Sequence, residues 1–125
     1  MKNKSILVID EKAFSRISSA ILESMGYMVE LFTNVENLSA KLCKSEIGLI
    51  ITSYPYCALM LDEINKWNIA TIVLTDNLDG KLYNRLREVE KSYCMIKPLD
   101  YDKFKSVVHE IMDGEIVFQG GYNIV

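Results

Sequence analysis

The stretch Ile47-Gly48-Leu49-Ile50-Ile51-Thr52-Ser53 decides the fold of this chain, because it is short, almost continuously apolar and rich in β-branched residues. Such a run is typical of a strand covered on both faces, as the strands of parallel sheets are. Similar runs lie at 6–9, 69–74 and 94–96, and a more alternating run at 27–32 suits an outer strand. The sequence therefore predicts five parallel strands.

Amphipathic segments with apolar residues at helical spacing separate these runs. The first helix should end at Gly26, and Asn34 can cap the start of the second. The fifth can begin at Asp100 or Asp102. The predicted helices lie around residues 14–25, 34–42, 59–67, 82–89 and 100–111. Alternating strands and helices predict an α/β fold, a doubly wound sheet with five helices on its two faces.

Composition excludes several other classes of protein. A chain of 125 residues suits one domain, and its net charge of -3 argues against a nucleic-acid partner. No apolar run approaches the roughly 20 residues of a membrane span, and we expect no membrane association. Cys43, Cys57 and Cys94 lack metal-ligand spacing, which indicates reduced thiols in a cytoplasmic protein.

Polar side chains stand where four of the predicted strands end. They are the acidic pair Asp10-Glu11, the hydroxyls of Ser53 and Thr75, and the ammonium group of Lys97. Function in doubly wound sheets lies at the carboxyl ends of the strands, so these groups should converge. They suit a phosphoryl-accepting site in all but one respect: Ser53 stands where a carboxylate nucleophile would be needed.

This ordered set resembles the receiver domains of response regulators in two-component signalling, the CheY-like family. The resemblance covers about the first 113 residues and rests on the segments 6–11 and 14–27, on Thr75 and on Lys97-Pro98. It implies a flavodoxin-like strand order of 2-1-3-4-5, a receiver domain at 1–113 and a C-terminal extension at 114–125.

The family's chemistry gives each position an implied role. Its acceptor aspartate takes a phosphoryl group, and the pair matched by Asp10 and Glu11 holds Mg²⁺. The residues matched by Thr75 and Lys97 bind the phosphoryl oxygens. Ser53 falls on the acceptor position.

The sequence departs from the family at three places. Ser53 replaces the acceptor; Asp76 stands where a small residue is usual and would repel a dianion. Cys94 occupies the switch position, and Tyr93 should point to the opposite face of the sheet. We therefore expect no conventional phosphotransfer, and weak Mg²⁺ binding at most. For Lys97 we expect an ion pair with Asp10, Asp76 or Glu11.

The tail, residues 115–125, is too apolar for a solvated terminus. Two β-rich runs flank Gly120-Gly121, which predicts a β-hairpin that packs on the domain or on another chain. The tail therefore suits a homodimer, and the resemblance to receiver domains implies a second surface for one, the face formed by the fourth helix, fifth strand and fifth helix.

The predicted function is an atypical receiver that acts as a protein-interaction module in a two-component or phosphorelay pathway, and not as an enzyme. A histidine kinase or another signalling protein would be its partner. One alternative is a receiver phosphorylated at another residue, with Asp76 or Asp10 available. A second is a flavodoxin-like enzyme or nucleotide binder, although no Gly-rich phosphate loop follows any predicted strand.

Overall fold

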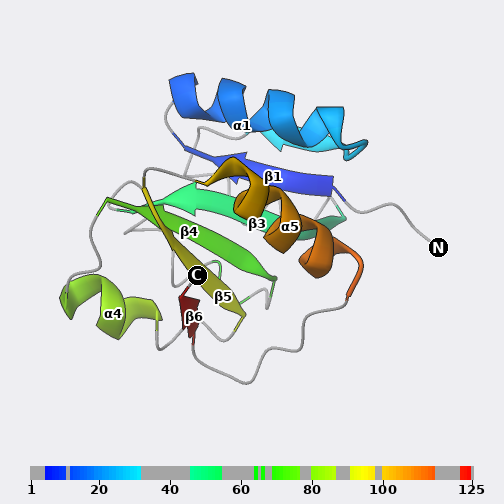
Figure 1. Ribbon diagram of the computed structural model, residues 1–125. Coiled ribbons are helices and arrows are strands. Elements are labelled where there is room, and N and C mark those ends of the chain that lie inside the picture. The colour runs from blue at the N-terminus through cyan, green and yellow to red at the C-terminus, as the bar shows by residue number, and fades with distance from the viewer. Residues whose placement is uncertain are drawn as a thin grey trace.

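In the computed structural model, a twisted sheet lies between helices, as in α/β folds (Figure 1). The structure describes residues 5–10, 12–31, 46–54, 64, 66, 69–76, 80–86, 91–97, 100–114 and 122–124. The elements in chain order are β1 (Ser5–Ile9), α1 (Lys12–Ser24), β2 (Val29–Leu31), β3 (Ile47–Ser53), β4 (Thr71–Thr75), α4 (Gly80–Leu86), β5 (Ser92–Ile96), α5 (Tyr101–Met112) and β6 (Tyr122–Ile124).

The sheet has the strand order β2-β1-β3-β4-β5-β6, and every neighbouring pair is parallel. The first five strands confirm the order 2-1-3-4-5. All residues of β1 and β4 are buried, whereas β2 is only partly covered. This burial is the physical reason for the continuous apolar runs in the centre of the sheet and for the alternating run at its edge.

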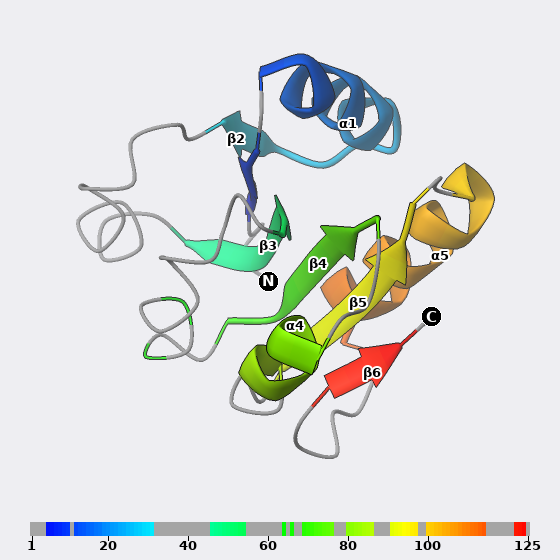
Figure 2. The ribbon, with the colours of Figure 1, turned by 90° about the vertical axis from the view of Figure 1, so that its left-hand side faces the viewer.

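The core lies in two layers, one on each face of the sheet (Figure 2). Helix α1 contributes Leu22 to one layer, and α5 contributes Phe104, Val107 and Val108 to the same layer. The opposite layer contains Leu82 and Leu86 of α4. Successive strand residues alternate between the layers, as Ile6 and Leu7 do in β1. Helices α1 and α5 therefore share one face, and α4 covers the other.

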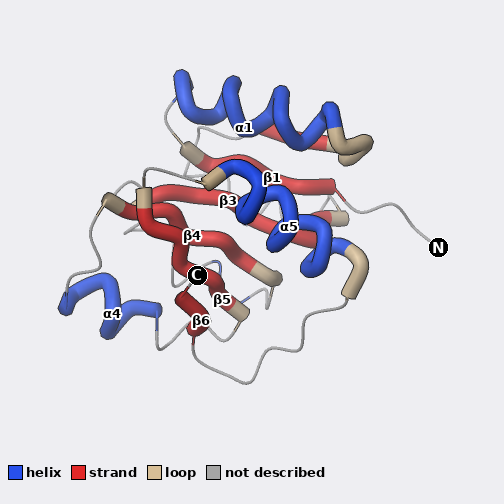
Figure 3. Tube along the Cα trace, viewed as in Figure 1, coloured by secondary structure: helices blue, strands red, loops and turns tan. Residues whose placement is uncertain are grey.

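Three of the five predicted helices, α1, α4 and α5, lie in the part of the chain that the structure describes (Figure 3). The predicted second helix falls outside it, and so does the third apart from residues 64 and 66. Ile64 is helical and buried in the α4-side layer. None of the helices in the described ranges is long and apolar enough to cross a membrane.

The helix boundaries follow the local signals in the sequence. Gly26, at φ 93°, follows the end of α1, and its N–H donates to the carbonyl of Glu23 at 3.0 Å. This left-handed backbone is one that glycine adopts without a steric penalty. At the start of α5, the Asp100 carboxylate accepts from the N–H of Lys103 at 3.2 Å. Asp100 is therefore the N-cap that the sequence offered as one of two choices.

The second run of the predicted tail hairpin forms a strand. Tyr122–Ile124 is β6, which pairs in parallel with β5. The first run and the turn lie outside the described residues, so the hairpin stays a prediction. The outer edge of β5 offers backbone groups that no other described strand pairs, and β6 forms hydrogen bonds with them.

Candidate functional site

The carboxyl ends of β1, β3, β4 and β5 bring the predicted site residues to one edge of the sheet. The strand register places Ile9 beside Thr52, so the next residues, Asp10 and Ser53, are also neighbours. Thr75 pairs with Ile96, and the carbonyl of Thr75 accepts from the N–H of Lys97 at 2.7 Å. We call Asp10, Ser53, Thr75, Asp76 and Lys97 the strand-end site. Glu11, the sixth predicted member, lies outside the described residues.

The centre of this site is a hydrogen bond between Ser53 and Asp10. The Oγ of Ser53 donates to Oδ2 of Asp10, and the two residues are only 5% and 2% exposed. A hydroxyl that donates to a carboxylate makes a charge-assisted bond, which is stronger than one between neutral groups. Ser53 therefore satisfies one oxygen of a buried carboxylate, at the position where a second carboxylate would repel it.

Two further hydroxyls hold the backbone around Asp10. Oγ1 of Thr52 donates to the carbonyl of Ile9 at 2.6 Å, and Oγ of Ser15 donates to the carbonyl of Asp10 at 3.1 Å. Both hydroxyls are buried. Sequence reasoning missed these supporting residues, although a threonine near the end of an apolar strand and a serine on the inner face of a helix were visible signals.

Lys97 contacts an aromatic ring. Its Nζ lies over the ring of Phe14, at 5.1 Å from the centroid, in a cation–π contact. The predicted ion pair of Lys97 with Asp10, Asp76 or Glu11 stays a prediction, because Glu11 lies outside the described residues. The Asp10 carboxylate is buried and accepts a hydrogen bond from Ser53, whereas the Phe14 ring at the start of α1 is only partly buried. The lysine therefore binds the accessible aromatic face.

The hydroxyl of Thr75 and the carboxylate of Asp76, both at the end of β4, have different surroundings. Thr75 is 3% exposed, whereas Asp76 is exposed to solvent. The charge of Asp76 thus sits at the rim of the strand-end site and is partly screened by water and salt. Its repulsion of an incoming dianion is weaker than that of a buried carboxylate at the same distance would be.

Residues 93 and 94 of β5 point to opposite faces of the sheet, as predicted. Cys94 is buried in the α4-side layer, and Tyr93 packs against the layer on the α5 side. Burial raises the pKa of the Cys94 thiol, which disfavours the reactive thiolate. Burial, and secondarily the charge of Glu110, raises the pKa of Tyr93. Residue 94 is therefore a small, buried side chain whose thiol stays protonated more readily than an exposed one.

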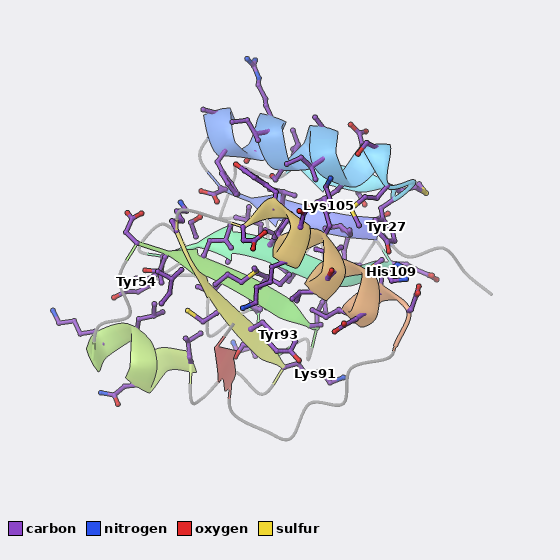
Figure 4. The ribbon with its side chains drawn as sticks, in the orientation of Figure 1. Tyr27, Tyr54, Lys91, Tyr93, Lys105 and His109 are labelled. Carbon is purple, nitrogen blue, oxygen red and sulfur yellow. The ribbon has the colours of Figure 1, made fainter. Side chains whose placement is uncertain are left out.

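The single histidine of the chain lies far along α5 from the strand-end site (Figure 4). Nδ1 of His109 is 3.3 Å from the hydroxyl of Tyr27, and Nε2 is 2.9 Å from Oδ2 of Asp113. Burial, and then the charge of Asp113, raises the pKa of Tyr27. Because His109 is held in this cluster, it does not serve as a base for Ser53.

The described part of the strand-end site holds few ligands for a divalent cation, and Glu11, the other half of the predicted acidic pair, lies outside it. No group of three or more histidine, cysteine and acidic side chains occurs within the ranges that the structure describes. Asp10 is the buried carboxylate of the strand-end site, Asp76 is the exposed one, and one oxygen of Asp10 accepts from Ser53. Mg²⁺ binding in proteins usually relies on carboxylates together with phosphate and water. A neutral hydroxyl in place of the second carboxylate weakens that set.

Comparison with known proteins identifies the fold. No family model matches the sequence, and no curated protein matches it. A two-component response regulator from Clostridium difficile has a similar structure, with a TM-score of 0.77 and 19% identity over 91% of this chain and 99% of that one. A CheY-like receiver domain protein from Methanospirillum hungatei has a TM-score of 0.75 and 20% identity, over 91% and 97% of the two chains.

A third similar structure is the beryllofluoride-activated NtrC4 receiver domain dimer, with a TM-score of 0.73 and 18% identity over 90% of this chain and 98% of that one. These likenesses extend over almost the whole of each chain. The protein therefore has the fold of CheY-like response-regulator receiver domains.

Proposed function

We propose that this chain is an atypical receiver in a two-component or phosphorelay pathway, and that it binds protein partners without conventional aspartyl phosphorylation. The receiver fold suggests two-component signalling. The observation that carries the finer proposal is the buried bond from Ser53 to Asp10 at the acceptor position. In place of a carboxylate nucleophile, the site holds a hydroxyl whose proton is directed at the neighbouring carboxylate.

The chemistry of Ser53 supports this proposal. A serine hydroxyl attacks phosphorus only when an adjacent base removes its proton. His109 is bound to Tyr27 and Asp113, and Asp10 is the described side chain that contacts the hydroxyl. Asp10 is 2% exposed and Ser53 is 5% exposed, so a phosphodonor has little access to either. A site of this kind holds one conformation, or changes it when a partner binds.

The partners that suit this fold are other signalling proteins, a histidine kinase among them, in the cytoplasm. We further propose a homodimer through the α4-β5-α5 face or the C-terminal tail. Ile96, at the end of β5, is 44% exposed, and Tyr101, at the start of α5, is 43% exposed. Both residues belong to elements of the proposed face, and large apolar side chains left exposed there would be covered by a second copy. The similar structure of the NtrC4 receiver domain is a dimer, which supports the proposed homodimer.

Treatment with acetyl phosphate and Mg²⁺ should leave the mass of the intact protein unchanged. The physical reason is the absence of a carboxylate nucleophile at residue 53. A conventional receiver treated in parallel provides the positive control. Added phosphate that hydroxylamine removes would contradict the proposal and indicate an aspartyl acceptor such as Asp76 or Asp10. Added phosphate that resists hydroxylamine would contradict it as well, and would indicate a serine ester.

Restoring the acceptor alone should restore little phosphorylation. In the Ser53→Asp protein, Asp76 still opposes the incoming dianion from the rim of the site. The Ser53→Asp/Asp76→Ala protein should therefore be phosphorylated several-fold faster, since about 1 kcal/mol of repulsion corresponds to roughly fivefold in rate. Mass spectrometry over time measures both rates. Equal rates in the single and double variants would show that Asp76 is no barrier.

A further inference from the structure

The sixth strand is joined to the sheet in an unusual way. β6 pairs in parallel with β5, with Ser92 beside Tyr122, Tyr93 beside Asn123 and Cys94 beside Ile124. It follows α5 in the chain, so β5, α5 and β6 form a crossover unit at the edge of the sheet (Figure 2).

The hand of this crossover follows from the topology. The unit β1-α1-β2 steps toward one edge of the sheet, and β4-α4-β5 steps toward the other edge with its helix on the other face. Compared with the first unit, the second reverses both the direction of the step and the face on which the helix lies. These two reversals cancel, so the two crossovers have the same hand. The unit β5-α5-β6 steps in the same direction as β4-α4-β5, but α5 lies on the face of α1. Its hand is therefore opposite to theirs.

This reversed hand makes the connection unfavourable. About 98% of parallel crossovers are right-handed, because the twist of the strands lets a connecting helix pack back onto the sheet only in that sense. The pairing of β6 with β5 does not depend on that hand, because a strand supplied by another copy would use the same register. Only the connection differs between the two arrangements.

We propose that Tyr122–Ile124 is an exchangeable strand, and that two copies of this chain associate when each places its β6 on the β5 edge of the other. Exchange keeps the three register pairs and relieves the reversed crossover. Each copy carries both the strand and the edge that receives it, so a two-fold dimer uses both and leaves no β5 edge uncovered. This inference rests on the homodimer proposed above and specifies how its tail takes part, and it does not depend on whether the protein is phosphorylated.

The length of the connection permits such an exchange. Nine residues, 113–121, separate the end of α5 from β6, and seven of them, 115–121, follow the described segment. Seven extended residues reach roughly 23–25 Å, whereas the step from a helix layer to the adjacent sheet is about 10 Å. The second copy would also approach Ile96, which is exposed two residues beyond the paired part of β5, and Tyr101, which is exposed at the start of α5. Their burial supplies an apolar contribution to association.

A disulfide trap tests the exchange in the full-length protein. Cys94 lies beside Ile124 in the register, and adjacent strands are spaced closely enough for a disulfide. One chain carries Ile124→Cys with Cys94→Ala, and a second chain of different mass keeps Cys94; both carry Cys43→Ser and Cys57→Ser. Mixed and oxidised, this pair can form a disulfide at the β5–β6 position only between chains. We expect a covalent heterodimer whose share rises with protein concentration.

The matched control replaces Ile124→Cys by Asn123→Cys, because Asn123 lies beside Tyr93 and not beside Cys94. It should give several-fold less covalent heterodimer. If Ile124→Cys gives no more covalent heterodimer than this control, the proposal is overturned. A single chain that carries both Cys94 and Ile124→Cys gives a second test: the proposal is also overturned if its disulfide is intramolecular at every protein concentration. In solution, the full chain should form dimers that a chain ending at residue 114 does not. An unchanged association state in the shortened chain would also overturn it.

Discussion

The Ser53→Asp protein should lose about 3 kcal/mol of unfolding free energy when divalent cations are absent. The substitution removes the hydrogen bond that Ser53 donates to Asp10 and places a second carboxylate beside a residue that is 2% exposed. Two buried carboxylates at this separation repel each other strongly. The same pair, however, recreates an anionic site for Mg²⁺. Adding Mg²⁺ should therefore restore most of the loss, about 2.7 kcal/mol at a concentration of 100 times the dissociation constant.

Denaturant unfolding with Mg²⁺ and with a chelator measures both effects. The unsubstituted protein should unfold at the same denaturant concentration in the two conditions, because the neutral hydroxyl of Ser53 weakens its donor set for the ion. Ser53→Asn is the matched control, since it has the size of the aspartate without the charge, and Mg²⁺ should not stabilise it. If Mg²⁺ stabilises the unsubstituted protein as much as Ser53→Asp, our account of the site is wrong.

The Phe104→Ala protein should lose about 3–5 kcal/mol of unfolding free energy. Phe104 is completely buried where α5 packs on the sheet, and it belongs to the largest fully buried side chains of the described residues. Its removal leaves a cavity in the layer shared with α1. For a domain of this size, the melting temperature should fall by more than 10 °C.

Tyr101→Ala is the control on the same helix. Tyr101 is 43% exposed, so its truncation should change the unfolding free energy by less than about 1 kcal/mol. Thermal unfolding followed by circular dichroism compares the two variants. Equal losses of unfolding free energy in the two variants would show that contacts at the exposed start of α5 stabilise the protein as much as the packing of Phe104 does.

The strands and helices of this protein were predictable because their signals are local. The apolar runs around Ile6–Ile9 and Ile47–Ser53 have the pattern of buried parallel strands, and the structure places them at the centre of the sheet. Gly26 and Asp100 mark helix ends through backbone conformation and capping, which are also local effects. The strand order came from the resemblance to receiver domains, since periodicity carries no information about which strands are neighbours.

The convergence of the strand-end site was also predictable, because parallel strands place all their carboxyl ends at one edge. Asp10 and Ser53, two of the residues expected to converge, are joined by a hydrogen bond. The partners of the side chains were less accessible to sequence reasoning. A lysine ammonium can reach several groups, and the contact of Lys97 with Phe14 depends on how α1 packs beside β5.

The sequence by itself determined the α/β class, the parallel core strands and the presence of a serine, not a carboxylate, at residue 53, because each depends on residue type or on local periodicity. Only the tertiary structure decided the bond from Ser53 to Asp10, the position of Lys97 over Phe14 and the pairing of β6 with β5. The β-propensity of the tail predicts a strand but names no partner for it. That partner is set by which sheet edge remains open after the other strands have paired, and this is a property of the whole fold.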